Sequence, residues 1–243
     1  MSCFSSARRR RNQPRRHVAI AVNTHELKFS ATGEKGDVSV ILLWPDGATH
    51  LLVLGHGAST NMRHTTMERI AEAMAARGVA TFRYNFPYSE NSTARNSTKT
   101  CVETIRNAVK AANAAAPHLK LLAGGHSFGG RMTTTAQSEK ALENVAALVL
   151  FSFPLHMPGG PDTKRAEHLA NIDMPMLFLS GTRDELATLD LLEPTIQKLG
   201  KRATLHKIET ANHGYKTLKK TRVSAEDVFD EMARVTRKWA DKR

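Results

Sequence analysis

Short, nearly continuous apolar runs alternate with longer segments of helical periodicity along most of the chain. The runs are rich in aliphatic and β-branched residues, and one closes with the turn sequence Pro45-Asp46-Gly47, as strands buried on both faces do. The predicted strands are Val38–Leu43, His50–Leu54, Val79–Tyr84, Leu119–Ala123, Val145–Phe151, Met176–Leu179 and Ala203–Ile208. Strands that alternate with helices predict an α/β fold, with a mainly parallel central sheet and helices on both faces.

Apolar spacing and capping residues predict the helices between these strands. Two of them begin at a capping box, in which a Thr is followed three residues later by a Glu. The first predicted helix begins at the capping box Thr65 and Glu68 and stops at Gly78. The second begins at the capping box Thr100 and Glu103 and reaches about Ala116. Further helices are predicted just after Ser127, from about Leu189 to Leu199, and from near Ser224 or Asp227. The polar segment Pro87–Thr98 is predicted to be a surface loop.

Residues 18–243 are predicted to form a single domain, and residues 1–17 a separate arm. The arm holds six arginines and no acidic residue, which is half of the formal net charge of +12. A terminal run of arginines is usually a solvated, disordered tail, and we expect one here. Nucleic-acid binding is the alternative, but Phe4 is the only ring in the arm that could stack on a base, so we do not expect it. Its composition is also compatible with an organelle transit peptide.

No apolar stretch approaches the roughly 18 residues that a membrane helix needs, so we expect no membrane span and a cytoplasmic location. The two cysteines, Cys3 and Cys101, are expected to be reduced. The histidines show no H-E-x-x-H spacing, and neither a cysteine pair nor a phosphate-binding loop is present. We therefore assign no metal and no cofactor, and leave the oligomeric state open.

The segment Gly125-His126-Ser127-Phe128-Gly129 matches G-x-S-x-G. It follows a predicted buried strand and opens a helix, which is the context that a nucleophile elbow requires. A serine hydroxyl is a poor nucleophile near neutral pH and needs a base, which in turn needs an orienting carboxylate. Ser127 is therefore the candidate nucleophile, and a glycine-rich turn with an incidental serine is the alternative.

The base and the carboxylate are expected after later strands, in the chain order Ser, Asp or Glu, His. Asp184 lies in the loop after the strand that ends at Leu179, and His213 lies in the loop after the strand that ends at Ile208. Glu185 and Asp190 are alternatives to Asp184, but they lie further from the strand end. His206 lies within a predicted strand and is expected to be a core or face residue.

A tetrahedral oxyanion needs two backbone N–H donors. The amide of Phe128, at the positive end of a helix, is one candidate. The amide of Ala58, in the loop Gly55–Ala58, is the second, although this loop could be only a tight turn. His56 is expected to order the loop or to contact the substrate. Arg131 lies one helical turn beyond Ser127 and binds either an anionic group or a structural carboxylate.

With these residues in place, the chain resembles the α/β-hydrolase superfamily. It is most similar to a dienelactone-hydrolase-related subfamily of predicted hydrolases, which includes a regulatory subunit of the non-specific-lethal histone acetyltransferase complex. The segments that carry the resemblance are Gly55–Ala58, Arg83–Tyr88, Gly125–Met132, Phe153–His156 and Ser180–Asp184. The chain departs from the family around the base, where Asn212-His213-Gly214 replaces the usual Asp-His followed by a polar residue. The resemblance implies the α/β-hydrolase fold and a reaction class, without a substrate.

Hydrolases of this fold often insert a cap domain after the strand that follows the elbow helix. Here only His156–Asp173 is available, which is too short, so we expect no cap and an open, shallow site. The expected function is a serine hydrolase that cleaves a small ester, thioester or lactone through an acyl-enzyme. The alternative is a non-catalytic interaction module, suggested by the basic surface and the acetyltransferase subunit, but an intact triad argues against it.

Overall fold

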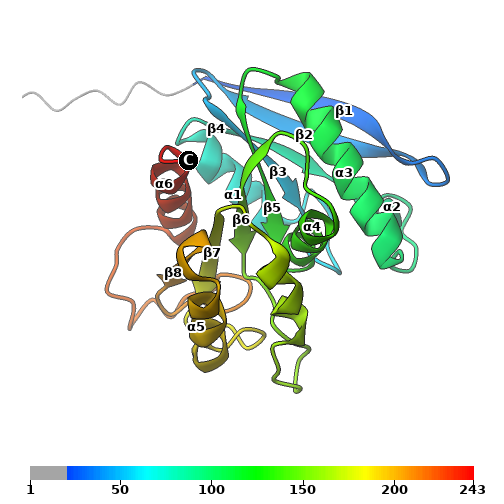
Figure 1. Ribbon diagram of the computed structural model, residues 1–243. Coiled ribbons are helices and arrows are strands. Elements are labelled where there is room, and N and C mark those ends of the chain that lie inside the picture. Colours follow the sequence, from blue (N-terminus) through cyan, green and yellow to red (C-terminus); the bar gives the residue numbers. More distant parts are fainter. Residues whose placement is uncertain (1–20) are drawn as a thin grey trace, which may run out of the picture.

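A single sheet runs through the computed structural model, which describes residues 21–243 (Figure 1). The arm predicted for residues 1–17 lies outside the described residues. Within them, eight strands pair in the order β1-β2-β4-β3-β5-β6-β7-β8. The strands are β1 Val22–Thr32, β2 Gly36–Pro45, β3 His50–Gly55, β4 Val79–Tyr84, β5 Lys120–His126, β6 Val145–Phe151, β7 Met176–Gly181 and β8 Ala203–Ile208.

The sheet is parallel from β4 to β8, and antiparallel only where β2 pairs with β1 and β4. The prediction of a mainly parallel sheet is confirmed. Parallel order brings the carboxyl ends of β3, β5, β6, β7 and β8 to one edge. Loops at that edge are where α/β proteins place their reactive groups.

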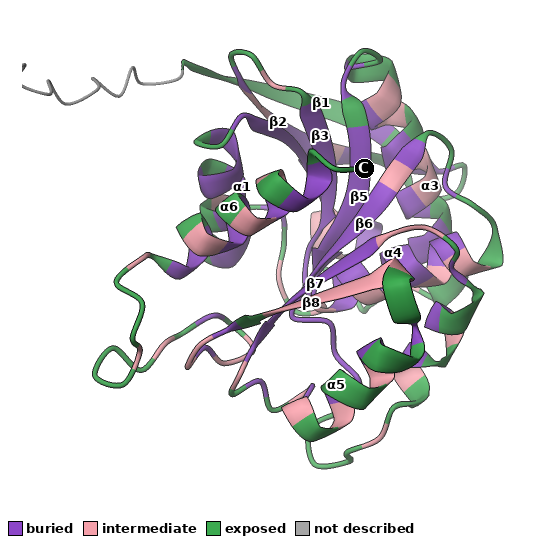
Figure 2. Ribbon diagram, turned by 60° about the vertical axis from the view of Figure 1, so that its left-hand side comes forward, coloured by how far each residue is buried: buried purple, intermediate pink, exposed green. Residues whose placement is uncertain are grey.

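Helices cover both faces of the sheet, as predicted. One face carries α1 Thr65–Ala75 and α6 Val228–Ala240, and the other carries α3 Thr98–Ala115, α4 Phe128–Glu139, α5 Leu189–Lys198 and the 3₁₀ helix η1 Lys164–Asn171. Figure 2 shows the strands at the centre of the sheet buried between these layers. Within residues 21–243, no helix has the length and apolar character that crossing a bilayer would require.

Strand β1 was missed by the sequence analysis. It lies at the edge of the sheet and pairs only with β2, so it exposes most of its residues (Figure 2). An edge strand buries too few side chains to produce a continuous apolar run, and here only Phe29, Ala31 and Thr32 are buried.

Both predicted capping boxes were wrong by one or more residues. The N-cap of α1 is His64, whose Nδ1 accepts a hydrogen bond from the Thr66 amide at 3.2 Å. The N-cap of α3 is Ser97, whose Oγ accepts from the Thr100 amide at 3.2 Å. At α6 one of the two predicted candidates is confirmed, because Asp227 is the cap.

The segment predicted as a loop from Pro87 to Thr98 also needs correction. It begins with a short helix, α2 Pro87–Glu90, that buries Tyr88 against the core. The Tyr88 ring stacks on Phe86 with 5.8 Å between ring centroids. The polar composition of the segment hides this one anchoring aromatic.

Strand β5 was predicted to end at Gly124-Gly125, but it continues to His126. The glycines allow close packing and are not the turn itself. A Cβ on Gly125 would lie 2.5 Å from the carbonyl oxygen of Gly55, and a Cβ on Gly129 would overlap the same carbonyl group. The start of α4 therefore rests directly on the end of β3.

We expect Gly129→Ala to destabilise the protein by about 1–3 kcal/mol, because the new methyl group overlaps backbone that cannot rotate away. For a chain of this size, that corresponds to a decrease in Tm of roughly 2 to 12 °C. Gly33→Ala is the matched control, since a Cβ at that position would have no neighbouring atom within 4 Å. Thermal unfolding measures both, and equal Tm values would show that α4 is not packed this closely on β3.

Candidate active site

Ser127 occupies the sharp turn between β5 and α4. Its backbone adopts φ 51° and ψ −113°, a left-handed conformation that is unfavourable for a residue with a side chain. Such backbone strain costs about 1–3 kcal/mol and persists where the surroundings fix it. Here the Ser127 amide donates to the Phe151 carbonyl oxygen at 2.8 Å, and the Ser127 carbonyl oxygen accepts from the Arg131 amide at 3.0 Å.

The side chain of Ser127 contacts His213. The distance between Ser127 Oγ and His213 Nε2 is 2.8 Å. On its other edge, His213 Nδ1 lies 2.9 Å from both carboxylate oxygens of Asp184. A nitrogen that faces a carboxylate carries the proton, so Nε2 is free to accept the hydrogen bond of the serine hydroxyl. The structure thus brings together all three residues predicted for the triad.

Adjacent strands hold the two partner loops together. Asp184 follows β7 and His213 follows β8, and the Arg183 amide donates across to the Ala211 carbonyl oxygen at 2.9 Å. Asp184 is 1% exposed, and its Oδ1 accepts from the Leu186 amide at 2.9 Å. A buried carboxylate held by an amide and an imidazole is fixed in one orientation.

The alternatives to these residues lie elsewhere. Glu185 and Asp190 are both exposed and make no hydrogen bond to His213. His206 faces α6, where its Nε2 lies 2.8 Å from Glu231 Oε1. His206 is therefore a face residue, one of the two places predicted for it.

His126 contacts the backbone of the candidate base, His213. Its Nε2 lies 3.2 Å from the carbonyl oxygen of His213, and the centroids of the two imidazole rings are 5.6 Å apart. Burial lowers the pKa of His126 to about 4, and the neighbouring His213 contributes to the decrease. The ring is therefore neutral near pH 7 and can hold the His213 backbone without placing a second positive charge beside the base.

His56 orders the loop after β3. Its Nε2 accepts a hydrogen bond from the Phe86 amide at 3.1 Å, so the proton lies on Nδ1, which is 2.8 Å from the Gly57 carbonyl oxygen. Burial lowers the pKa of His56 to about 4. The ring has no exposed surface, so of the two predicted roles it fills the structural one and has no face left for a substrate.

The two predicted oxyanion donors come from segments in direct contact, because Gly129 of α4 packs on the carbonyl groups of Gly55 and His56. Among residues 21–243, neither the Phe128 amide nor the Ala58 amide donates a hydrogen bond within the protein. Phe128 N–H also lies in the first turn of α4, where the helix dipole favours negative charge. Amides without a partner, on two neighbouring segments, are the kind of donor that a developing oxyanion requires.

Arg131 has no structural ion pair within the described part of the chain, where no carboxylate oxygen comes within 4 Å of its guanidinium. Its guanidinium carbon lies 5.6 Å from the centroid of the Phe128 ring. Sequence reasoning missed Arg95, which lies 5.4 Å from the same centroid. Arg95 is in a polar loop 32 positions before Ser127, and no sequence pattern connects the two.

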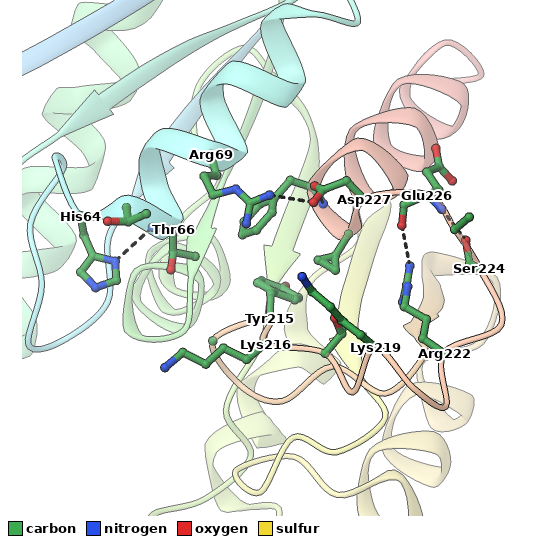
Figure 3. A pocket seen from close by; sticks show the side chains of 16 residues that line it. His64, Thr66, Arg69, Tyr215, Lys216, Lys219, Arg222, Ser224, Glu226 and Asp227 are labelled. Atoms are coloured by element: carbon green, nitrogen blue, oxygen red, sulfur yellow. Dashed lines mark hydrogen bonds and ion pairs between the residues drawn. The ribbon is translucent and has the colours of Figure 1, made fainter.

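A cavity of about 930 Å³ lies beside the loop that carries His213 (Figure 3). Gly214 and Tyr215 line it together with the start of α1 and the segment that leads into α6. Arg69 and Asp227 form an ion pair of 2.7 Å across it. Ser127, Asp184 and His213 are not among its lining residues, so the reacting atoms lie outside this cavity. Within residues 21–243, no group of three or more His, Cys, Asp or Glu side chains is placed to hold a metal ion.

Comparisons with known proteins agree with this architecture. A family model described as an alpha/beta hydrolase domain matches residues 48–241. The structure is similar to a dienelactone hydrolase from Anabaena variabilis, with a TM-score of 0.69 and 20% identity over 90% of this chain and 98% of that one. A serine hydrolase without lid from Xanthomonas campestris gives a TM-score of 0.69 and 18% identity, over 89% and 94% of the two chains. Est1E from Butyrivibrio proteoclasticus gives a TM-score of 0.68 and 14% identity, over 89% of this chain and 98% of that one.

These matches confirm the predicted α/β-hydrolase fold. The lack of a cap agrees with them, since only η1 and loops lie between β6 and β7. The link to an acetyltransferase complex stays a prediction.

The buried histidines generate an expectation about pH. A ring with pKa about 4 in the folded protein and about 6.5 when unfolded takes up its proton preferentially in the unfolded chain. The free energy of unfolding therefore keeps the full contribution of each neutral ring above about pH 6.5. It loses this contribution, on the order of 3 kcal/mol for each ring, as the pH falls toward 4. We expect His126→Gln to reduce this pH-dependent loss, measured by urea unfolding across that range.

The exposed His25 provides the control. His25→Gln should leave the pH dependence of the free energy of unfolding as it is in the wild type. If the curves for His126→Gln and wild type run parallel from about pH 7.5 to about pH 4.5, the buried ring is not the origin of the loss.

Proposed function

The chain belongs to the α/β-hydrolase family, and from this premise we propose that it is a serine hydrolase that cleaves a carboxylic ester, a thioester or a lactone. One observation carries the proposal: short contacts run without a break from Ser127 Oγ through His213 to a buried Asp184. This is the arrangement that activates a serine hydroxyl.

In the first half of the proposed reaction, Ser127 Oγ attacks the carbonyl carbon while His213 Nε2 takes the hydroxyl proton. The bond to the leaving oxygen or sulfur then breaks, and His213 returns the proton to that atom. Asp184 keeps the imidazole in the required tautomer and stabilises its positive charge. The amides of Phe128 and Ala58 donate to the oxyanion of the tetrahedral intermediate.

In the second half, water replaces the leaving group. His213 accepts a proton from the water, the hydroxide attacks the acyl carbon, and the bond to Ser127 Oγ breaks. The proton passes back to the serine, and the carboxylic acid leaves. Each half uses the same oxyanion donors, because the carbonyl oxygen keeps its position.

The proposed substrates are small. Ser127 and His213 are both partly exposed, and the segment between β6 and β7 contributes no cap. A serine hydrolase described as lacking a lid is among the similar structures, and others of them are described as esterases. These likenesses support ester chemistry at an open site.

We expect Ser127→Ala and His213→Ala to reduce kcat for p-nitrophenyl acetate by about 10⁴-fold or more, because each removes a group that bonds or transfers a proton. Asp184→Asn should reduce kcat by roughly 10³- to 10⁴-fold, because it favours the wrong tautomer. Glu185→Gln, next in the chain and exposed, is the matched control and should hydrolyse the ester at nearly the wild-type rate. Turnover by folded Ser127→Ala at the wild-type rate would disprove the proposal.

A second expectation concerns chain length. At an open site the distal methylene groups of a long acyl chain stay in water, so they contribute none of the roughly 0.8 kcal/mol that each would give on burial. Values of kcat/KM for p-nitrophenyl esters should therefore not increase beyond butyrate. A rise of several-fold with each added pair of methylene groups, through octanoate to laurate, would instead indicate an enclosed acyl tunnel.

A further inference from the structure

Two arginines from separate segments lie over the ring of Phe128, the residue that follows the candidate nucleophile, and the charge of a third acts on one of them. Arg95 comes from the segment between α2 and α3, Arg131 from α4, and Arg165 from η1. The guanidinium carbons of Arg95 and Arg131 lie 5.4 and 5.6 Å from the centroid of the Phe128 ring. A helical side chain leans toward the N-terminal end of its helix, so Arg131 extends back over the turn that carries Ser127.

This cluster has no counter-charge in the described part of the chain. None of the three guanidiniums comes within 4 Å of a carboxylate oxygen, whereas Arg63, Arg69 and several other arginines do. Arg165 donates to the His156 carbonyl oxygen at 2.9 Å, which fixes its position.

The environment of Arg131 is unfavourable for an unpaired cation. Its side chain is half-buried, and its guanidinium donates no hydrogen bond within residues 21–243. Burial lowers the pKa of Arg131, and the positive charges of Arg165 and Arg95 lower it further. A half-buried charge is only partly hydrated, so an ionic partner would be favourable. An anion held here would accept hydrogen bonds from the guanidinium and relieve the repulsion among the three arginines.

The position of the cluster relative to the base indicates which part of a substrate it would meet. Phe128 packs on the sheet face that carries α3 and α4. His126 lies beside His213 and packs on Tyr215, which belongs to the opposite face. The leaving oxygen must lie next to His213, which returns its proton. An acyl chain that extends away from His213 on the other side would pass over Phe128 toward Arg95 and Arg131.

We propose that this cluster binds a carboxylate at the far end of the acyl chain, so that the preferred substrates are monoesters of short dicarboxylic acids. The inference rests on the proposed function of Ser127. The short acyl chain would cross the small part of the Phe128 ring that stays exposed (7%), and the terminal carboxylate would accept hydrogen bonds from Arg131. Hydrolysis consumes one water and releases the alcohol and the dicarboxylate, with no other reactant.

The test compares monoethyl glutarate with ethyl valerate, which have acyl chains of the same number of carbon atoms and differ in the terminal carboxylate. We expect the wild type to hydrolyse monoethyl glutarate with a kcat/KM at least about tenfold higher, as charge-assisted hydrogen bonds to the carboxylate would give. Arg131→Met should abolish most of this ratio, and Arg131→Lys should retain part of it. Because both esters are measured on one sample, the ratio does not depend on how much of a variant is folded.

Two further variants test whether the ratio of the two kcat/KM values depends on the arginines beside Phe128. Arg95→Met, at an exposed position, should lower the ratio to a smaller extent. Arg63→Met removes the same charge from an arginine that pairs with Glu26 at 2.6 Å, and should leave the ratio unchanged.

The outcomes separate the two proposals. Comparable kcat/KM values for both ethyl esters, or hydrolysis of p-nitrophenyl acetate alone, would overturn the carboxylate site and leave the serine hydrolase standing. An unchanged ratio in Arg131→Met would also overturn it. Failure of folded wild type to hydrolyse any of the three esters would overturn the proposed function, and the carboxylate site with it.

Discussion

Ser127 holds a left-handed turn between β5 and α4, and the positions of the other candidate site residues follow from it. A serine at φ 51° is strained, and the strain is held by contacts that only glycines permit, between α4 and the end of β3. The same contacts set the position of the Phe128 amide and of the loop that carries Ala58. One packing arrangement therefore fixes the turn that carries the hydroxyl and the two segments that carry the candidate oxyanion donors.

Parallel strand order provides the other partners of that turn. Because β6, β7 and β8 lie side by side next to β5, their carboxyl-end loops meet where the serine emerges. Neutral, buried histidines then hold these loops: His56 under the β3 loop, and His126 under the backbone of His213. Burial lowers the pKa of both rings and keeps them uncharged near pH 7, so neither opposes protonation of His213.

Much of this arrangement could be predicted from the sequence, because its signals are local. Buried parallel strands give apolar runs, and Ser127, Asp184 and His213 each follow such a run. The features that were not predicted leave no clear mark in the local sequence pattern. Edge strand β1 buries too little to show a pattern, and the caps at His64 and Ser97 depend on which side-chain atom reaches a free amide. The approach of Arg95 to Phe128 arises from tertiary packing across separate loops, which a single sequence does not encode in its spacing.

If folding alone activates Ser127, a fluorophosphonate will label this residue covalently. A phosphonate of this kind reacts with a serine that an adjacent base has activated, whatever the natural substrate is. We expect one adduct per wild-type chain, located at Ser127 by peptide mass spectrometry and absent from His213→Ala. A folded wild-type protein that stays unlabelled, or is labelled at another residue, would contradict it and favour an α/β-hydrolase domain that serves as an interaction module.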